Sequence, residues 1–264
     1  MRIRVPLTLT SRHALVCGAS AGIGRAAALA LASLGARVTV LARSRDKLEA
    51  LVPELRAAGA EDADFVVADL DDRASVRAAV APLVAATPVH ILVNNQSGPP
   101  GCALVDETEE ALQLALGRIL LSSHLLAQLC VPGMRDAGFG RIVNVLSTSV
   151  REPIVGLGAG NVARGAMAAW AKTLALELPP GITVNNVLPG YTATDRLAEL
   201  AQAAATRNAK TREDIEAMWA AITPEKRLGL PDELGAVIAF LASPAASFVR
   251  GQSIAVDGGR LHSL

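Results

Sequence analysis

The stretch HALVCGASAGIG, residues 13–24, sets three glycines directly behind a short apolar run. The run at 13–17 has the length and composition of a buried strand, and the segment IGRAAALALASLG at 23–35 is typical of a helix. Glycines let the chain turn sharply between the two, and free amides at the start of the helix favour a negatively charged phosphate. The sequence therefore predicts a phosphate-binding turn of a dinucleotide site, formed by Gly18, Ser20, Gly22, Ile23 and Gly24.

The end of the next predicted strand bears on which dinucleotide binds. A dinucleotide fold often carries an acidic residue there for the ribose 2′-hydroxyl, but this strand ends VTVLARS, with Ala42 followed by Arg43. An arginine can hold a 2′-phosphate with charge-assisted hydrogen bonds, so the sequence favours NADP(H) over NAD(H). Ser44 and Arg45 are equally good candidates for the phosphate, and Arg43 as a solvated loop residue is the alternative.

Short β-branched runs alternate with longer Ala/Leu-rich runs along the whole chain, which is the pattern of βαβ units. Strands are expected at residues 13–17, 37–41, 64–67, 90–94, 141–146, 183–188 and 253–256. Helices are expected to begin near Ile23, Arg45, Asp72, Glu107, Asn161 and Asp232. The pattern predicts an α/β fold, a doubly wound seven-stranded parallel sheet of the Rossmann type, as a single domain over residues 1–264.

One segment, residues 192–226, is longer than a simple crossover helix and carries Ala-rich and charged helical stretches. Ligands of open α/β sheets bind beyond the carboxyl ends of the strands, so an insertion there is a natural helical lid over the substrate. An ordinary surface helical hairpin is the alternative.

The composition of the 264 residues narrows the class of protein. There are 25 Lys+Arg against 25 Asp+Glu, so no net charge attracts a nucleic acid. Three cysteines and four histidines show neither a disulfide framework nor the spacing of a metal site. We expect a cytoplasmic protein without a leader, a membrane span, a nucleic-acid partner or a bound metal, acting on a small-molecule substrate.

Several motifs, in order, resemble the short-chain dehydrogenase/reductase family over nearly the whole chain. They are CGASAGIG (17–24), VVADL (66–70), ILVNNQSG (91–98), GRIVNVLS (140–147), ITVNNVLPGYTATD (182–195) and GQSIAVDGG (251–259). The resemblance implies a Rossmann-type domain, a dimer or tetramer, and hydride transfer between a nicotinamide and a carbonyl or alcohol. It implies further cofactor contacts at Asp69 and Leu70 for the adenine, at Asn94 beside the cofactor, and at Pro189, Gly190, Thr192 and Thr194 around the nicotinamide. Taken singly, these residues are equally well explained as strand ends, helix caps and turn residues.

The family's catalytic Asn-Ser-Tyr-Lys tetrad is mostly replaced. Ser147 matches the serine that binds the substrate oxygen, whereas the Tyr-xxx-Lys positions fall on Gly160 and Arg164 and the asparagine position on Ile119. Gly160 has no proton to give. Arg164 is too basic for an ordinary general acid but keeps donors for the nicotinamide ribose, so we expect it to bind the cofactor.

Three functions are compatible with an intact cofactor turn and a replaced tetrad. The first is an NADP(H)-dependent oxidoreductase acting on a carbonyl, enone or imine, or on the corresponding alcohol, with altered proton delivery. The second is an NADP-binding protein without redox turnover, and the third is a non-redox lyase or isomerase using the same pocket. For the first, the expected proton donor is Tyr191 or Ser147. Tyr191 is the only tyrosine, and it either gives the proton, with Arg164 near its phenolate, or only packs against cofactor or lid.

Other residues have packing roles in this interpretation. His124, Trp170 and Trp219 are expected in a core or an interface, and Cys17, which stands where the family usually has threonine, is expected to be a small buried side chain. The low charge of residues 112–131 predicts that this helical segment contributes to the interface of a homo-oligomer, a tetramer or a dimer.

Overall fold

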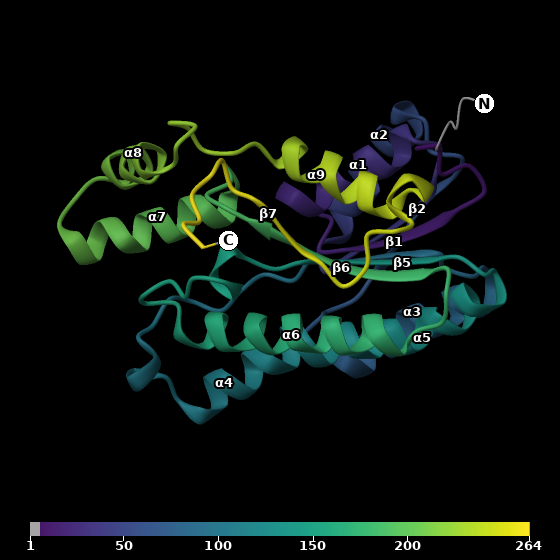
Figure 1. Cartoon of the computed structure of the whole chain (residues 1–264), viewed down its shortest axis with the longest axis horizontal. Coiled ribbons are helices and arrows are strands. Elements are labelled where there is room, and N and C mark those ends of the chain that lie inside the picture. The colour runs from purple at the N-terminus through teal and green to yellow at the C-terminus, as the bar shows by residue number, and fades with distance from the viewer. Residues whose placement is uncertain (1–5, 264) are drawn as a thin grey trace.

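The sheet has seven parallel strands in the order β3-β2-β1-β4-β5-β6-β7 (Figure 1). The computed structural model describes residues 6–263, so residues 1–5 and 264 of the predicted domain lie outside the described part. The strands are β1 (His13–Cys17), β2 (Arg37–Ala42), β3 (Ala63–Val67), β4 (Ile91–Asn94), β5 (Gly140–Val145), β6 (Ile182–Pro189) and β7 (Ser253–Val256). The doubly wound parallel sheet is confirmed, and strand ends differ from the prediction by one residue or none.

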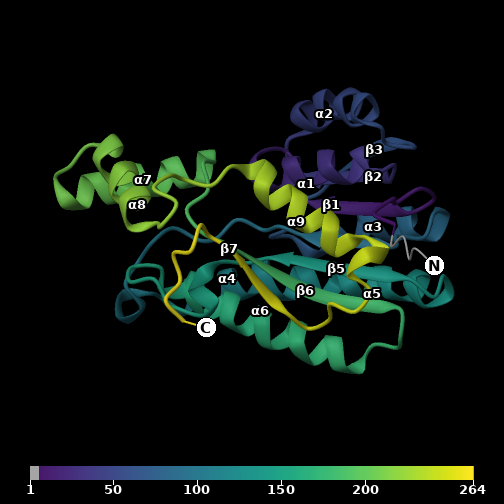
Figure 2. The same cartoon turned by 45° about the horizontal axis from the view of Figure 1, so that its top comes forward.

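Helices cover both faces of the sheet in two layers (Figures 1 and 2). They are α1 (Gly22–Ser33), α2 (Arg45–Ala58), α3 (Arg73–Ala86), α4 (Glu109–Leu116), α5 (Ser122–Asp136), α6 (Gly158–Glu177), α7 (Asp195–Asn208), α8 (Arg212–Ile222) and α9 (Pro231–Ala242). One apolar core joins the sheet to α1, α2 and α9, and a second joins it to α3, α5 and α6. Strands buried on both faces explain the short, continuous apolar runs in the sequence.

The segment from α4 to α5 differs from the sequence prediction. Residues Glu109–Asp136 are long and apolar enough, by length and composition, to cross a membrane, although no such stretch was expected. Half of its most apolar window is buried in the protein, against α3 and α6, which is the packing of a core helix. A π-helical turn at Gly117–Leu121 separates α4 from α5, so the predicted interface segment is interrupted and largely internal.

A row of polar side chains, three buried amides and one serine hydroxyl, runs across four strands beneath the carboxyl edge of the sheet. Asn94 Nδ2 donates to Asn144 Oδ1 (2.9 Å), Asn144 Nδ2 donates to Asn186 Oδ1 (2.9 Å), and Asn186 Nδ2 reaches Ser253 Oγ (3.0 Å). These residues are paired in the strand register, so the row is a direct product of the parallel ladder. At its end, Asn94 Oδ1 is buried and accepts no hydrogen bond from the described residues.

The predicted lid segment forms a hairpin of α7 and α8 that extends beyond one end of the sheet (Figure 2). The two helices share a small apolar cluster of their own: Ala201, Ala205 and Ile215, with Ala204 and Trp219 packed against it. The hairpin joins the domain through a short parallel pairing, in which Gly229 N donates to Tyr191 O and Ala193 N to Gly229 O, both at 2.8 Å.

Candidate functional site

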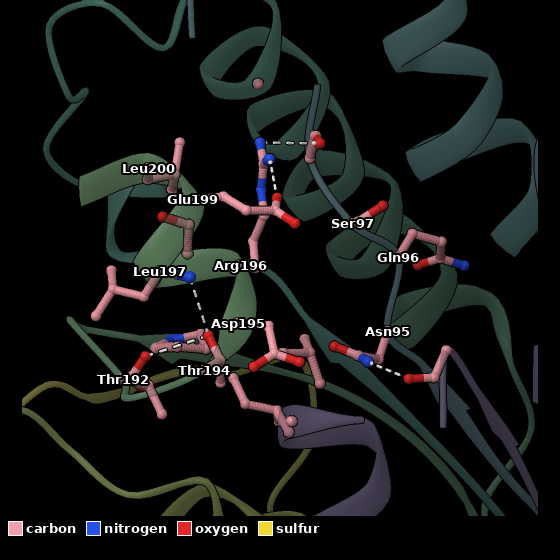
Figure 3. Close-up of a pocket in the computed structure, with 18 of the residues that line it drawn as sticks. Asn95, Gln96, Ser97, Thr192, Thr194, Asp195, Arg196, Leu197, Glu199 and Leu200 are labelled. Atoms are coloured by element: carbon pink, nitrogen blue, oxygen red, sulfur yellow. Dashed lines mark hydrogen bonds and ion pairs between the residues drawn. The ribbon is translucent and has the colours of Figure 1, made fainter. Parts of the chain in front are cut away.

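The glycine turn leaves no room for side chains at two of its three glycines. A Cβ built on Gly18 would lie 2.0 Å from the carbonyl oxygen of Asn95, and one on Gly24 would lie 2.2 Å from the carbonyl oxygen of Gly18. Gly18 also has a φ of +63°, which L residues rarely adopt. Asn95 Nδ2 donates to Gly18 O at 3.1 Å and braces the turn (Figure 3).

The start of α1 is open to an anion. Its N-cap residue, Ala21, offers no side-chain acceptor, and its first turn contains no acidic residue, so its first amides have no side-chain partner. Amides in this position, at the positive end of a helix, bind phosphate groups. The turn therefore fits the pyrophosphate of a dinucleotide on its own geometry.

A cavity of about 1020 Å³ lies beyond the carboxyl ends of the strands and holds nearly every predicted site residue. Lining it are Gly18, Ser20, Gly22, Ile23, Arg43, Asp69, Leu70, Ser147, Arg164, Pro189, Gly190, Tyr191, Thr192 and Thr194. Gly24 and Asn94 do not line it: Gly24 packs inside the turn and Asn94 belongs to the amide row. No group of three or more His, Cys, Asp or Glu that could hold a metal occurs within residues 6–263.

The loop after β3 forms one end of the cavity. Arg43 Nη1 lies 4.0 Å from Asp69 Oδ2, and the Arg43 side chain is 70% exposed, free to reach a ligand. Arg118 from the π-helical turn donates to Asp71 from its Nη2 at 2.6 Å, and this hydrogen bond lowers the pKa of the Asp71 carboxyl. Ser122 Oγ donates to Leu70 O, so the loop is held from two sides. Sequence reasoning missed Arg118, which no motif marks.

The middle of the cavity contains three of the four positions that the sequence analysis matched to the family tetrad, Ser147, Gly160 and Arg164. Ser147 Oγ accepts a hydrogen bond from Ser149 N at 3.1 Å, and Arg164 Nε donates to Leu146 O at 3.1 Å. Burial and the neighbouring Arg196 lower the pKa of Arg164 to about 10. A Cβ on Gly160 would lie 3.2 Å from Arg164 Nη1, so the guanidinium occupies the space beside this glycine.

The fourth tetrad position plays no direct part in this cavity. Ile119 is buried within the π-helical turn and does not line the cavity, and its carbonyl accepts a hydrogen bond from Ser123 Oγ at 2.8 Å.

Tyr191 is packed between other side chains. Its ring stacks on Trp219 from the lid, with ring centroids 4.7 Å apart and planes 6° from parallel. The guanidinium of Arg260 lies 4.8 Å from the same ring and donates to Thr148 Oγ1 at 2.8 Å. The cation against the ring is Arg260, which comes from a distant part of the chain, and the pairing of the Tyr191 hydroxyl with Arg164 stays a prediction.

The α7–α8 hairpin, the predicted lid, contributes side chains to the cavity. Arg196 at the start of α7 donates from Nη2 to Pro99 O (2.6 Å) and Gly98 O (3.3 Å) and pairs with Glu199 (Figure 3). It thereby ties the lid to the segment after β4. Sequence reasoning missed Arg196 and Arg260, and it assigned Trp219 to packing without placing it in the cavity. The lid has no motif of its own.

Known proteins resemble the chain in sequence and in structure. Residues 18–260 match the family described as Enoyl-(Acyl carrier protein) reductase. NADPH-dependent reductase BacG of Bacillus subtilis is 30% identical and covers 97% of this chain and 100% of its own. Galactitol 2-dehydrogenase (L-tagatose-forming) of Cereibacter sphaeroides is 34% identical, covering 98% of each chain. Among solved structures, an actinorhodin polyketide ketoreductase with NADPH superposes with a TM-score of 0.90 at 32% identity, covering 96% of this chain and 98% of its own.

The family match spans the fold from the glycine turn to the end of the sheet, and the relatives cover the chain almost end to end. The chain belongs to the short-chain dehydrogenase/reductase family of oxidoreductases.

Proposed function

We propose that the protein is an NADP(H)-dependent oxidoreductase that transfers hydride between the nicotinamide and a carbonyl, enone or imine, or the corresponding alcohol. One observation carries the proposal: a single cavity joins the glycine turn and Arg43 to Ser147 and Arg164, so a dinucleotide can reach from one end to the other. Bound there, the nicotinamide supplies or accepts the hydride. In the direction of reduction, the substrate carbon gains that hydride, and a proton from water is gained by the oxygen of a carbonyl, the nitrogen of an imine or the α-carbon of an enone.

Preference for the phosphorylated cofactor is supported at the end of β2. Arg43, Ser44 and Lys47 line the cavity there, and Ala42 places no carboxylate where a 2′-phosphate would lie. An arginine and a lysine attract a phosphate that an acid would repel. BacG is named as NADPH-dependent, and the actinorhodin ketoreductase was solved with NADPH.

The proposal includes an altered route for the proton. Gly160 offers no acid, and the hydroxyls of Ser147 and Tyr191, which both line the cavity, are the candidate donors. General acid catalysis contributes about 10²–10⁴-fold, so a ketone would be reduced slowly. An enone or an iminium takes hydride at carbon without needing an acid beside a developing alkoxide. We therefore expect enones and iminium ions to be reduced faster than simple ketones.

The experiment is a substrate panel with a labelled cofactor. Ketones, enones and cyclic imines are incubated with NADPH deuterated at the transferred position, and products are examined by mass spectrometry, with Ser147→Ala as the control. Deuterium in the product is expected for enones or imines. Tight NADPH binding without deuterium transfer would instead support a cofactor-binding protein. Substrate conversion without cofactor oxidation would support a lyase or isomerase.

Assembly and compartment are part of the same proposal. We infer a homo-oligomer, a dimer or tetramer, and membership of the family supports this assembly. We also infer a cytoplasmic location, which is supported by the three cysteines, all of them free thiols.

A further inference from the structure

Two guanidinium groups meet at Gly98. Arg164 from α6 lies so close that a Cβ on Gly98 would be 2.8 Å from its Nη2 and 2.9 Å from its Nη1. Arg196 from α7 donates from its Nη2 to the carbonyl oxygen of the same glycine at 3.3 Å. Both side chains line the cavity. The absence of a side chain at residue 98 therefore lets two positive charges converge on one place.

The charge of Arg164 is not neutralised by the protein. Its only hydrogen bond to the described residues is the one from Nε to Leu146 O, and no carboxylate within residues 6–263 lies within 4.0 Å of it. Arg196 has one acidic partner, Glu199, at 3.1 Å. Of the two neighbouring cations, Arg196 has a carboxylate partner and Arg164 has none among the described residues. Burying an arginine without a counter-ion is costly, so the arrangement calls for an anion from outside the chain.

Gly160 belongs to this arrangement. Because a Cβ there would already lie 3.2 Å from Arg164 Nη1, a large side chain at residue 160 would displace the guanidinium. Glycines at 98 and 160 therefore flank the guanidinium and leave its outer nitrogens facing the cavity. A planar fork of this kind is suited to two oxygens of one carboxylate.

A third arginine reaches the cavity from the end of the chain. Arg260 donates from Nη1 to Thr148 Oγ1, beside Ser147, while its buried Nε has no partner among the described residues. Arg207 of α7 lines the cavity as well. Around Ser147 and the lid, four arginines thus face two acids, Asp195 and Glu199.

We propose that the substrate is a carbonyl compound carrying a carboxylate, which pairs with Arg164 and Arg196 at Gly98. This inference rests on the proposed reductase function and names its substrate class. The cofactor does not supply the missing charge, because its ribose hydroxyls are neutral and its phosphates belong at the glycine turn and Arg43. The carboxylate completes the ion pairs, and it holds the carbonyl in the part of the cavity that Ser147 lines.

The first test measures binding without turnover. Phenylpropanoate and its neutral counterpart phenylpropanamide are titrated calorimetrically into the protein saturated with NADP⁺, with phenyl phosphate as a second anion. We expect the carboxylate to bind about 10- to 100-fold more tightly than the amide. Tighter binding of phenyl phosphate than of phenylpropanoate would mean that the site takes a phosphate and not a carboxylate. Equal affinity for acid and amide would overturn the proposal.

Variants assign the effect to the two arginines. Arg196→Gln and Arg164→Gln are each expected to remove the acid's advantage over the amide, and NADP⁺ affinity is titrated separately because Arg164 is also expected to bind the cofactor. Arg212→Gln is the matched control, since Arg212 lies on the lid outside the cavity and pairs with Glu216. Arg164→Lys keeps the positive charge but loses the two-pronged guanidinium, so its affinity for the acid should be intermediate. Binding by this variant would show that the protein still folds when residue 164 is substituted. An advantage that survives both glutamine variants would contradict the proposal.

Kinetics separates this inference from the function on which it rests. 3-Benzoylacrylate, an enone acid, and benzoylformate, a keto acid, are compared with their methyl esters, and Arg196→Gln is expected to raise KM for the acids alone. If esters and acids are reduced equally well, the reductase stands and the carboxylate site fails. If nothing is reduced but phenylpropanoate binds through Arg196, the site stands and the reductase fails.

Discussion

His13, at the start of β1, is a histidine held neutral by its surroundings. Its side chain is buried, Nε2 lies 2.8 Å from Thr39 Oγ1, and burial together with Arg37 lowers its pKa from 6.5 to about 4. The folded state therefore binds a proton less tightly than the unfolded state. Stability from this group is complete above pH 6.5, falls as the pH drops towards 4, and then levels off.

We expect protonation of His13 to lower the free energy of unfolding by about 3 kcal/mol as the pH falls from 6.5 to 4. Urea unfolding followed by circular dichroism at several pH values checks this in wild type and in His13→Gln. The difference between the two should shrink as the pH falls. If the unfolding free energies of the two proteins changed in parallel with pH, His13 would not titrate in this range.

Arg43 is predicted to select the cofactor. Arg43→Ala should reduce the preference for NADPH over NADH by about 10- to 100-fold, because a charge-assisted hydrogen bond to the 2′-phosphate is lost. Arg45→Ala is the control, since Arg45 pairs with Glu49 and does not line the cavity. Fluorescence titration of both cofactors measures the affinities. Equal affinities in the wild type would contradict the prediction.

Tyr191 is predicted to pack rather than to donate a proton. Tyr191→Phe keeps the ring that stacks on Trp219, so turnover should stay within a few-fold of wild type. A general acid would instead show a fall of about 10²–10⁴-fold in kcat with cofactor affinity intact. That result would identify Tyr191 as the donor. Tyr191→Leu, which removes the stack, is expected to weaken substrate binding.

At the scale of elements, the sequence predicted which residues at strand ends line the cavity. It did not predict which side chains from more distant segments line it. The glycine turn and Arg43 follow strands that are buried on both faces, so a local pattern places them in space. Arg196 and Arg260 reach the cavity from segments far along the chain, through contacts to Pro99 O and Thr148 Oγ1 that no local period encodes. Nor does the sequence pattern predict the π-helical turn that positions Arg118.

The amide row ends beside a cysteine. Val16 and Val93 are register partners, so the next residues, Cys17 and Asn94, point to the same face of neighbouring strands. Burial raises the pKa of the Cys17 thiol, which stays protonated, yet Asn94 Oδ1 accepts no hydrogen bond from the described residues. A stronger donor at residue 17 would satisfy it.

Cys17→Thr is therefore expected to be more stable than Cys17→Val by about 1 kcal/mol, because the two side chains have the same shape and only threonine donates. Thermal unfolding of the two variants measures the difference. Equal melting temperatures would mean that the Asn94 oxygen is already satisfied, for example by water.

For the whole molecule, we predict a homo-oligomer. Leu114 is 51% exposed and Leu121 43% exposed on the α4–α5 segment, and Leu176 on α6 is 76% exposed. Covering such side chains in a subunit interface is favourable. Light scattering in dilute solution should give the mass of a dimer or tetramer, and Leu114→Glu with Leu121→Glu should lower it. Met218→Glu on the lid is the control, and a stable wild-type monomer would contradict the prediction.

The lid's construction bears on how this protein can change over evolutionary time. The α7–α8 hairpin encloses an apolar cluster of its own and enters the domain through the short pairing of Thr192 with Gly229. Mutations in the hairpin that spare Arg196 and Trp219, its contacts to the rest of the domain, can therefore reshape the entrance of the cavity while the sheet and the glycine turn keep their packing. We therefore expect that the hairpin can diverge in sequence, or be exchanged between relatives, and change substrate choice. The cost to the stability of the sheet and the glycine turn should be small. The same boundary marks where a designer would graft a new hairpin.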